Sequence, residues 1–287
     1  MADRLRELWD FHDLESTEGR FQECLEAETD TESRAEILTQ LARVRGLRGE
    51  FDEGELLLVE AGALADAEGS GSARVRIDLE RGRLRRSSGD PGAALPLFES
   101  AFQAAVEAAE LALAADAAHM AALAAPNRET MLSWTQAGID VAESSADPSV
   151  RYWLGPLLNN VGWEHHESGE YEQALAAFQR ALDERERDPA NRAAIEIARY
   201  AVAKTLRALG RPAQAAPLLE QAVAWAESEG EPDGWFHEEL AETYMALGRA
   251  SRARDQAERA LALLPSADPS FAESERAGRL CGYAARP

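Results

Sequence analysis

The sequence lacks the features of several protein classes. No apolar run in its 287 residues approaches a membrane span, and residues 1–16 contain no apolar core of the length a signal peptide needs. The two cysteines, Cys24 and Cys281, are too few and too far apart in sequence to indicate a disulfide framework or a zinc site. We therefore expect a cytoplasmic protein with reduced thiols, no membrane contact, no metal and no cofactor.

Positive charge is also scarce. The formal net charge is −22, and Lys204 is the only lysine among the 30 basic residues. Binders of nucleic acids or anionic membranes present a net basic face, so neither partner is expected. Four arginines between Glu80 and Arg86 form one local basic island, but the flanking sequence becomes acidic within a turn or two. We predict that this island forms salt pairs with a neighbouring repeat or captures a peptide carboxylate.

Sheet-forming residues are few as well. Alanine, leucine, glutamate and arginine dominate the composition while β-branched residues are sparse. This composition favours helices, and we expect essentially no sheet.

An internal repeat organises most of the chain. Six anchor positions have similar neighbourhoods and lie 40, 36, 44, 41 and 38 residues apart: Gly49, Gly89, Ala125, Gly169, Gly210 and Gly248. Small residues stand seven positions before every anchor: Ala42, Gly82, Ala118, Gly162, Ala203 and Ala241. Such a row indicates a place where two helix backbones approach closely, and a glycine such as Gly169 suits the positive φ of a tight turn.

The residues after each anchor continue the pattern. Around Gly169 they are Ala174, Phe178 and Ala181, at offsets of five, nine and twelve. Small, large and small residues at these offsets form one stripe of a helix. The same offsets place Trp134 in the row of bulky residues with Phe98 and Phe178. The repeat unit is therefore predicted to be two antiparallel helices joined by a tight turn.

This unit resembles the tetratricopeptide repeat from about Arg34 to Pro265, and the residues that carry the resemblance are Leu158, Gly162, Gly169, Tyr171, Ala174, Phe178 and Ala181. The resemblance implies an all-α protein, a right-handed α-α superhelix of about six helix pairs with terminal capping helices. The spacings exceed the usual family length, which implies longer second helices or longer loops. No turn residue marks the expected helix break between Ala101 and Ala125.

Three regions follow from the repeat: an N-terminal helical cap over 1–33, the solenoid over 34–265 and a C-terminal capping helix and tail over 266–287. In the first region Ser16 is predicted to cap a helix, and in the last Phe271 and Leu280 are predicted anchors. Loops are expected at 69–72, 146–148 and 229–234, where glycine or proline interrupts the pattern.

The resemblance also implies that the first helix of each unit lines a concave groove. If the small row faces the partner helix, the next residue in sequence begins a different face. That face and its neighbours are rich in arginine, asparagine and aromatic residues, whereas much of the remaining polar sequence is Glu and Asp. The candidate site comprises Arg43, Glu80, Arg83, Arg86, Asp116, His119, Asn159, Asn160, Trp163, His166, Tyr200, Lys204 and Arg207.

This chemistry suits an anionic guest. Guanidinium and amide groups bind carboxylate or phosphate, and Trp163 and Tyr200 offer flat apolar surfaces. Each polar position can also be plain solvated surface. His165 is expected to pack against the adjacent helix instead. We therefore predict a non-catalytic adaptor that binds a protein or peptide, with anionic groups, in the groove.

The alternative is a small-molecule receptor or an enzyme. Asp116 and His119 lie three apart on one expected helix, and a carboxylate that orients a histidine begins general-base chemistry or a metal site. Asn160, Trp163 and His166 complete this candidate cluster. No nucleophile motif or phosphate loop accompanies it, so no catalytic residue is assigned.

Overall fold

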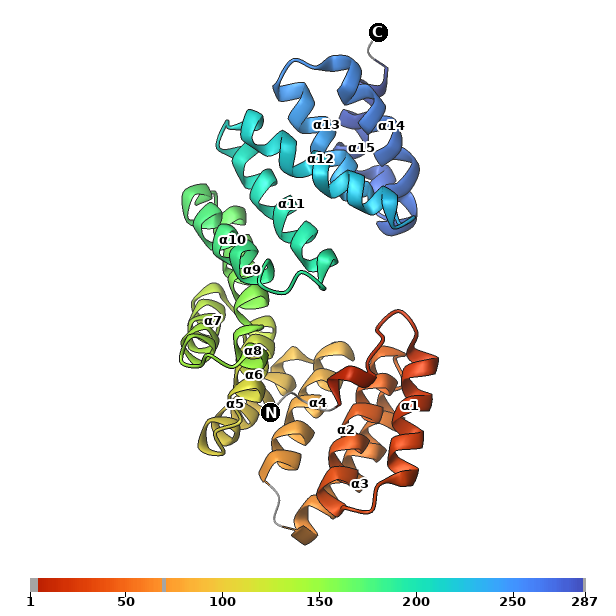
Figure 1. Cartoon of the computed structure of the whole chain (residues 1–287), viewed down its shortest axis with the longest axis vertical. Coiled ribbons are helices and arrows are strands. Elements are labelled where there is room, and N and C mark those ends of the chain that lie inside the picture. Colours follow the sequence, from red (N-terminus) through yellow and green to blue (C-terminus); the bar gives the residue numbers. More distant parts are fainter. Residues whose placement is uncertain (1–4, 69–70, 286–287) are drawn as a thin grey trace. The chain divides into compact units, whose positions relative to one another are not determined.

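The chain is an all-α helical repeat. The computed structural model describes residues 5–68 and 71–285, and within these ranges it contains helices and no strand (Figure 1). No helix in these ranges has both the length and the apolar character needed to cross a membrane. The chain divides into two compact units, Met1–Leu157 and Leu158–Pro287, which are described separately.

Unit 1 begins with a short 3-10 helix, η1. Its elements are η1 (Arg6–Leu8), α1 (Leu14–Ala27), α2 (Thr31–Leu47), α3 (Phe51–Glu68), α4 (Gly71–Ser87), α5 (Pro91–Glu107), α6 (Leu111–Ala124), α7 (Arg128–Glu143) and α8 (Pro148–Arg151). Helix α9 (Leu154–Glu167) starts in unit 1 and continues into unit 2.

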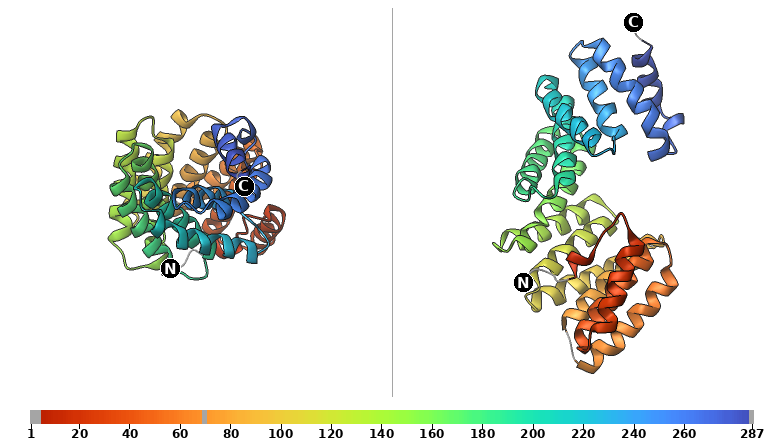
Figure 2. Two further views of the ribbon diagram at one scale, coloured as in Figure 1. Left: turned by 90° about the horizontal axis from the view of Figure 1, so that it is seen from above. Right: turned by 45° about the vertical axis from the view of Figure 1, so that its right-hand side comes forward.

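Unit 2 continues in the same style. Its further elements are α10 (Tyr171–Arg185), α11 (Arg192–Ala208), α12 (Pro212–Ser228), α13 (Gly234–Ala246), α14 (Ala250–Ala267), η2 (Phe271–Glu273) and α15 (Glu275–Ala284). Across both units the first helices of the repeats are α2, α4, α6, α9, α11 and α13, and the second helices are α3, α5, α7, α10, α12 and α14. In unit 1, α2 contacts α4 and α4 contacts α6, so these first helices lie side by side (Figure 2).

Glycine forms the turn in five of the six pairs, as predicted. Gly49, Gly89, Gly169, Gly210 and Gly248 all have φ between 70° and 93°. The residue after Gly169, Glu170, donates its backbone N–H to the carbonyl of His165 at 2.8 Å, which closes the end of α9. The third pair differs, because α6 ends at Ala124 and the side chain of Asn127 caps α7.

The helix break expected between Ala101 and Ala125 lies at residues 108–110. Helix α5 ends at Glu107, α6 begins at Leu111, and Ala109 between them has φ 58°. The Cβ of an alanine is strained in this left-handed region, where glycine is usual. Because alanine stands here, the sequence gives no glycine signal for the break.

The rows of small and large residues pack as predicted. A Cβ added to Gly162 would lie 2.5 Å from Cε1 of Phe178, and one added to Gly82 would lie 2.4 Å from Cε1 of Phe98. Both phenylalanines are fully buried. Glycine therefore stands where an aromatic ring from the second helix presses on the backbone of the first.

The third pair is shifted by one residue relative to the prediction. Thr135 and Gly138 are buried, whereas Trp134 and Ala137 are only half-buried. Trp134 instead meets Phe102 edge-on, with ring centroids 5.3 Å apart. The turn without glycine is one residue longer than the anchor at Ala125 implied, and this rotates α7.

The ends of the chain bring one correction and one confirmation. Asp13, and not Ser16, caps α1, because its carboxylate accepts the backbone N–H of Ser16 at 3.0 Å. Phe271 and Leu280 are buried C-terminal anchors, as expected. The loops at 146–148 and 229–234 connect helices apart from their last residues, Pro148 and Gly234, which begin α8 and α13. Residues 69 and 70 of the first expected loop lie outside the described residues, and α4 begins at Gly71.

Candidate functional site

Unit 1 contains a cavity of about 510 Å³ on the face formed by its first helices. The floor comes from α2, α4 and α6, one side comes from α8 and the two residues that follow it, and the N-terminal segment forms the rest. The lining residues, here called the unit 1 cavity, are Arg6, Glu7, Trp9, Phe11, Gln40, Arg43, Arg76, Leu79, Glu80, Ala112, Leu113, Asp116, Ser149, Tyr152 and Trp153. The predicted site residues Arg43, Glu80 and Asp116 are therefore brought together.

The charges at the floor of this cavity compensate one another. Arg83 donates to Glu80 and, at 2.5 Å, to Asp116 on the neighbouring first helix. Burial lowers the pKa of Arg83, but Asp116 and Glu80 more than offset this effect, so its pKa lies above the ordinary value. Arg43 lies 4.0 Å from Glu80, and burial followed by repulsion from Arg83 lowers its pKa. The predicted cations are present here, but paired carboxylates cancel much of their charge.

His119 lies beside these groups without joining the network. Its ring is 5.6 Å from that of Trp153, and its Nδ1 is buried with no hydrogen-bond partner among the described residues. Burial lowers its pKa to about 4, with Asp116 opposing the shift and Arg83 adding to it. The hypothesis of a carboxylate that orients this histidine is not realised, because Arg83 holds Asp116 and Nδ1 is unbonded.

The arginine island pairs with neighbouring repeats, one of the two outcomes predicted. Arg81 lies 2.8 Å from Glu55 on α3, and Arg85 lies 3.8 Å from the same carboxylate. Arg86 is exposed and donates to the backbone carbonyl of Leu123 at 3.2 Å. No ion pair is found for Arg86 within the described ranges, which leaves its charge available.

Unit 2 carries an aromatic row across three first helices. Trp163 on α9 lies 5.0 Å from Phe178 and 6.4 Å from Tyr200 on α11, measured between ring centroids. Tyr200 in turn lies 5.5 Å from Phe236 on α13, and burial raises its pKa. Trp163 and Tyr200 remain half-buried, so part of each ring faces outward.

The cations of unit 2 share one buried carboxylate. Glu239 is 2% exposed; Arg207 donates to it and Lys204 Nζ lies 3.6 Å away. Lys204 also donates to the hydroxyl of Tyr200 at 3.1 Å. Burial lowers the pKa of Lys204, but Tyr200 and Glu239 offset this, and the net shift is upward.

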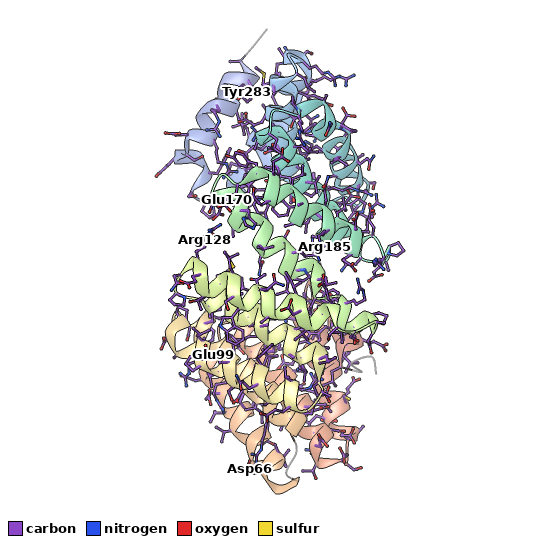
Figure 3. All side chains as sticks on the ribbon, turned by 90° about the vertical axis from the view of Figure 1, so that its left-hand side faces the viewer. Asp66, Glu99, Arg128, Glu170, Arg185 and Tyr283 are labelled. Atoms are coloured by element: carbon purple, nitrogen blue, oxygen red, sulfur yellow. The ribbon has the colours of Figure 1, made fainter. Side chains whose placement is uncertain are left out.

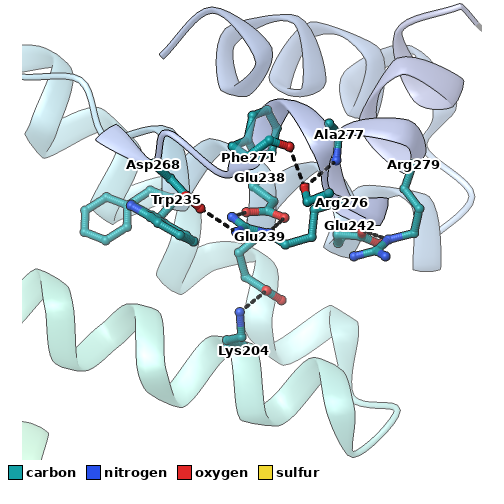
Figure 4. A network of polar contacts seen from close by, with 12 residues as sticks. Lys204, Trp235, Glu238, Glu239, Glu242, Asp268, Phe271, Arg276, Ala277 and Arg279 are labelled. Carbon is teal, nitrogen blue, oxygen red and sulfur yellow. Dashed lines mark hydrogen bonds and ion pairs between the residues drawn. The ribbon is translucent and has the colours of Figure 1, made fainter. Parts of the chain in front are cut away.

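The other carboxylates of α13 are covered from the C-terminal side (Figure 4). Arg276 of α15 binds Glu238, lies 3.1 Å from Asp268, and stacks 4.2 Å from the ring of Trp235. Arg279 binds Glu242 at 3.1 Å. Arginines of α15 thus neutralise the acidic face of α13.

Polar side chains of the second helices also contact neighbouring helices. Asp66 on α3 pairs with Arg74 on α4 at 2.8 Å, and both are largely exposed (Figure 3). Arg185 on α10 donates to the carbonyl of Ala194 at 2.9 Å. These contacts join adjacent helices.

Buried polar atoms without a partner occur at several predicted site residues. Within the described ranges such atoms are Oε2 of Glu80, Nδ1 of His119, Oδ1 of Asn159, Nδ2 of Asn160 and Nε2 of His166. Glu196, His237 and Thr243, outside the predicted site, carry others. Burial lowers the pKa of His166, and Lys204 adds to the shift, which favours the neutral ring. On the first helices, the predicted residues of unit 2 form what we call the unit 2 surface: Asn159, Asn160, Trp163, His166, Tyr200, Lys204 and Arg207.

Sequence reasoning missed several neighbours of these residues. Helix α8 and the rings of Tyr152 and Trp153 were not anticipated, nor were Trp9 and Phe11 beside the cavity. The aromatic pair at 152–153, four residues after the end of the expected loop at 148, was the available signal in the sequence for these rings. His165, expected to pack on the adjacent helix, is half-buried and pairs its Nδ1 with Glu170, the residue before α10. Within the described part of the chain, no group of three His, Cys, Asp or Glu residues is arranged to hold a metal ion.

Comparison with known families and structures agrees with the fold. Family models described as Tetratricopeptide repeat match residues 155–188 and 206–277. A comparison with curated protein sequences gives no match.

Several solved structures have a similar fold. A Signal Transduction ATPase with Numerous Domains protein with a tetratricopeptide repeat sensor, from Pyrococcus horikoshii, gives a TM-score of 0.70 at 13% identity. That match covers 88% of this chain and 40% of that chain, so this chain spans less than half of the relative. BtubC (BKLC) from P. vanneervenii gives a TM-score of 0.60 at 15% identity over 80% and 94% of the two chains.

The quorum sensor NprR from B. thuringiensis is similar over nearly the whole chain. Its apo form gives a TM-score of 0.58 at 14% identity over 98% of this chain and 85% of that chain. NprR in complex with its cognate peptide NprX gives 0.52 at 15% identity over 99% and 88%. At sequence identities this low, the structural matches show that the fold is similar and nothing about shared function.

Proposed function

This chain is a tetratricopeptide repeat protein, and we propose that it is a non-catalytic protein-interaction module that binds an extended peptide along its first helices. The NprR complex supports the proposal, because a chain of similar fold there holds a peptide. The residues proposed to take part in binding, by contact or by holding the site in shape, are those predicted from the sequence, considered separately in each unit.

The unpartnered polar atoms carry this proposal. Leaving a buried donor or acceptor unpaired costs about 1–3 kcal/mol, and folded proteins rarely keep such groups without a reason. Asn159, Asn160 and His166 hold such atoms on one helix, α9, and the ring of His166 lies 5.5 Å from the half-buried ring of Trp163. These atoms are closed to solvent, so we propose that the side chains turn on binding and that a ligand with both donors and acceptors then satisfies them.

An extended peptide has the matching chemistry. Its backbone alternates N–H donors and C=O acceptors, and an asparagine amide can bind one of each. The outward parts of Trp163 and Tyr200 offer surfaces for the side chains of the peptide. The unit 2 surface therefore suits main-chain recognition combined with an aromatic platform.

An anionic group of the partner would bind best at Arg86. The cations Arg83, Lys204 and Arg207 already face carboxylates, so an incoming anion would have to compete with them. Arg86 is exposed, and its charge acts on His119, which has a free Nδ1. We propose that a peptide carboxylate binds Arg86, while Arg43, Glu80, Arg83 and Asp116 hold the floor of unit 1 in shape.

The first test is a selection of random twelve-residue peptides displayed on phage against the purified chain. Selected peptides should lose most of their affinity for Asn160→Ala and Asn159→Ala but keep it for the matched control Gln173→Ala, an exposed position on α10. The asparagine variants should melt at or above the wild-type temperature, because each truncation removes an unpaired buried atom. If the selected peptides bind both asparagine variants as well as wild type, the proposal is wrong.

The second test concerns the anion. In a separate selection of peptides with a free carboxyl terminus, a peptide that binds unit 1 should bind more tightly than its amidated form, and Arg86→Gln should abolish this difference. Arg85→Gln is the matched control, because Arg85 points to Glu55 instead. A difference that survives in Arg86→Gln would place the carboxylate elsewhere.

A further inference from the structure

The unit 1 cavity is partly closed by the chain's own N-terminal segment, residues 5–13 (Figure 1, dark red). Nε1 of Trp9 donates to Oε1 of Gln40 on α2 at 2.9 Å. The guanidinium of Arg43 lies 5.2 Å from the ring of Trp9 and 5.4 Å from that of Phe11. Arg6 lies 3.9 Å above the ring of Tyr152, which also lines the cavity. The segment therefore contacts α2 and the end of α8 through three side chains.

Trp9 is half-buried and meets the buried ring of Phe21 edge-on, with centroids 5.4 Å apart, but the contacts of Phe11 and Arg6 differ from ordinary core packing. Phe11 is 57% exposed although it stacks on Trp9 with centroids 4.8 Å apart, and Arg6 is exposed as well. A side chain that belonged to the core would be enclosed, as Leu5 and Phe21 are. The arginine and the two aromatic rings lie on the cavity in the manner of a bound peptide, with stacking and cation–π contacts.

The backbone of the segment is fastened elsewhere, to α1. The hydroxyl of Thr17 accepts the N–H of Asp10 and donates to its carbonyl, both at 2.9 Å. Arg20 Nε donates to the carbonyl of Leu8 at 2.8 Å. These backbone contacts involve Thr17 and Arg20, whereas Arg6, Trp9 and Phe11 line the cavity with their side chains. A mutation at Thr17 can therefore loosen the segment without changing a side chain that lines the cavity.

We propose that the unit 1 cavity is a binding site for a peptide of another protein that carries an arginine, a tryptophan three residues later and a second aromatic residue two residues after that. Residues 6–11 of this chain are an internal competitor for the same site. The external peptide places its tryptophan against Gln40 and Arg43 and its arginine over Tyr152. This proposal concerns unit 1 and does not depend on peptide binding by the unit 2 surface.

Internal competition has a calculable effect. A segment tethered by a short linker acts at an effective concentration of millimolar order. If the external peptide binds the open cavity with a dissociation constant of about 10 µM, the tethered segment weakens its apparent binding about 100-fold. Wild-type protein should therefore bind such a peptide poorly, and a variant with an emptied cavity should bind it well.

The test uses a fluorescein-labelled peptide with the sequence of residues 5–13, and its fluorescence anisotropy is titrated with the full chain. The double variant Trp9→Ala/Phe11→Ala should bind it about 100-fold more tightly than wild type does. Adding Arg43→Ala to that variant should abolish binding, and so should alanine at both aromatic positions of the peptide. Equal binding to wild type and the double variant, or equal binding of the alanine-substituted peptide, overturns the proposal.

A second variant keeps the test decisive if the double variant does not fold. Thr17→Val removes the fastening of Asp10 but leaves every cavity side chain in place, so it should bind the peptide at least several-fold more tightly than wild type. Unchanged binding by a folded Thr17→Val variant counts against internal competition. Light scattering over a range of concentrations identifies exchange of the segment between two copies, and a dimer that disappears in the double variant would assign the cavity to that exchange instead.

Discussion

Gly162→Leu should destabilise unit 2 because it meets a ring that has no room to move. A Cβ at Gly162 would lie 2.5, 2.6 and 2.9 Å from three carbons of Phe178, whose side chain is fully buried. Overpacking of this kind costs about 1–3 kcal/mol, and contact with three ring atoms favours the upper end. Leucine regains about 0.8 kcal/mol through its better helix propensity. The net loss should be about 2 kcal/mol, measured by urea unfolding with circular dichroism.

A matched control separates packing from propensity. Gly62 is also inside a helix, α3, but no atom lies within 4 Å of its added Cβ. Gly62→Leu should therefore be neutral or stabilising, by up to about 0.8 kcal/mol. A Gly162→Leu protein that unfolds at the same urea concentration as wild type would refute the assignment of the helix contact.

The double variant with Phe178→Ala tests the contact directly. Phe178→Ala alone should cost about 3–5 kcal/mol through the cavity it leaves. In combination with Gly162→Leu, the new leucine can enter that cavity, so the double variant should be about 1–3 kcal/mol more stable than the two single effects predict. Strict additivity would mean that the two side chains do not share one space.

Three further predictions concern the turns, the histidine and the shared carboxylate. Ala109→Gly should stabilise the chain by about 0.5–1 kcal/mol because it relieves a left-handed alanine, while Gly169→Ala should cost about 1 kcal/mol in thermal unfolding. Because the pKa of His119 is about 4 when folded and 6.5 when unfolded, the unfolded chain binds the proton first, and stability falls as the pH drops from about 6.5 through about 4. The loss is at most about 3 kcal/mol. The His119→Asn variant should lack this loss, so the loss should appear as the difference between the stability–pH curves of wild type and variant. Glu239→Gln should cost about 1–3 kcal/mol, because Lys204 and Arg207 lose their common partner, and an undiminished free energy of unfolding would contradict that pairing.

The repeat could be found in the sequence because its tightest contacts and turns each require one particular residue, glycine. Glycine at a positive φ and glycine beneath a phenylalanine ring both exclude other residues, so Gly82, Gly162 and Gly169 mark the structure directly. The third pair lacked this contrast. Its turn has no glycine, and alanine occupies most nearby positions, so a shift of one residue between Thr135 and Trp134 left no trace in the pattern.

The candidate site was only partly predictable for a different reason. Helical periodicity identified the rows that contain Arg83, Asp116 and Glu239, but it did not show which charges meet. Those ion pairs join successive first helices and depend on how each helix is rotated. The N-terminal segment was harder still, because Trp9 reaches Gln40 through a turn and one hydrogen bond that have no periodic signal.

One helix serves two cores. Leu157 of α9 presses on Gly138 in unit 1, while Gly162, little more than one turn further along, receives Phe178 in unit 2. Fraying of α9 at its N-terminal end would remove the contact of Leu157 with Gly138, and fraying at its C-terminal end would remove the contact of Gly162 with Phe178. Unfolding of unit 1 and unfolding of unit 2 should therefore be thermodynamically linked through α9, as unfolding of adjacent repeats is linked in other repeat proteins.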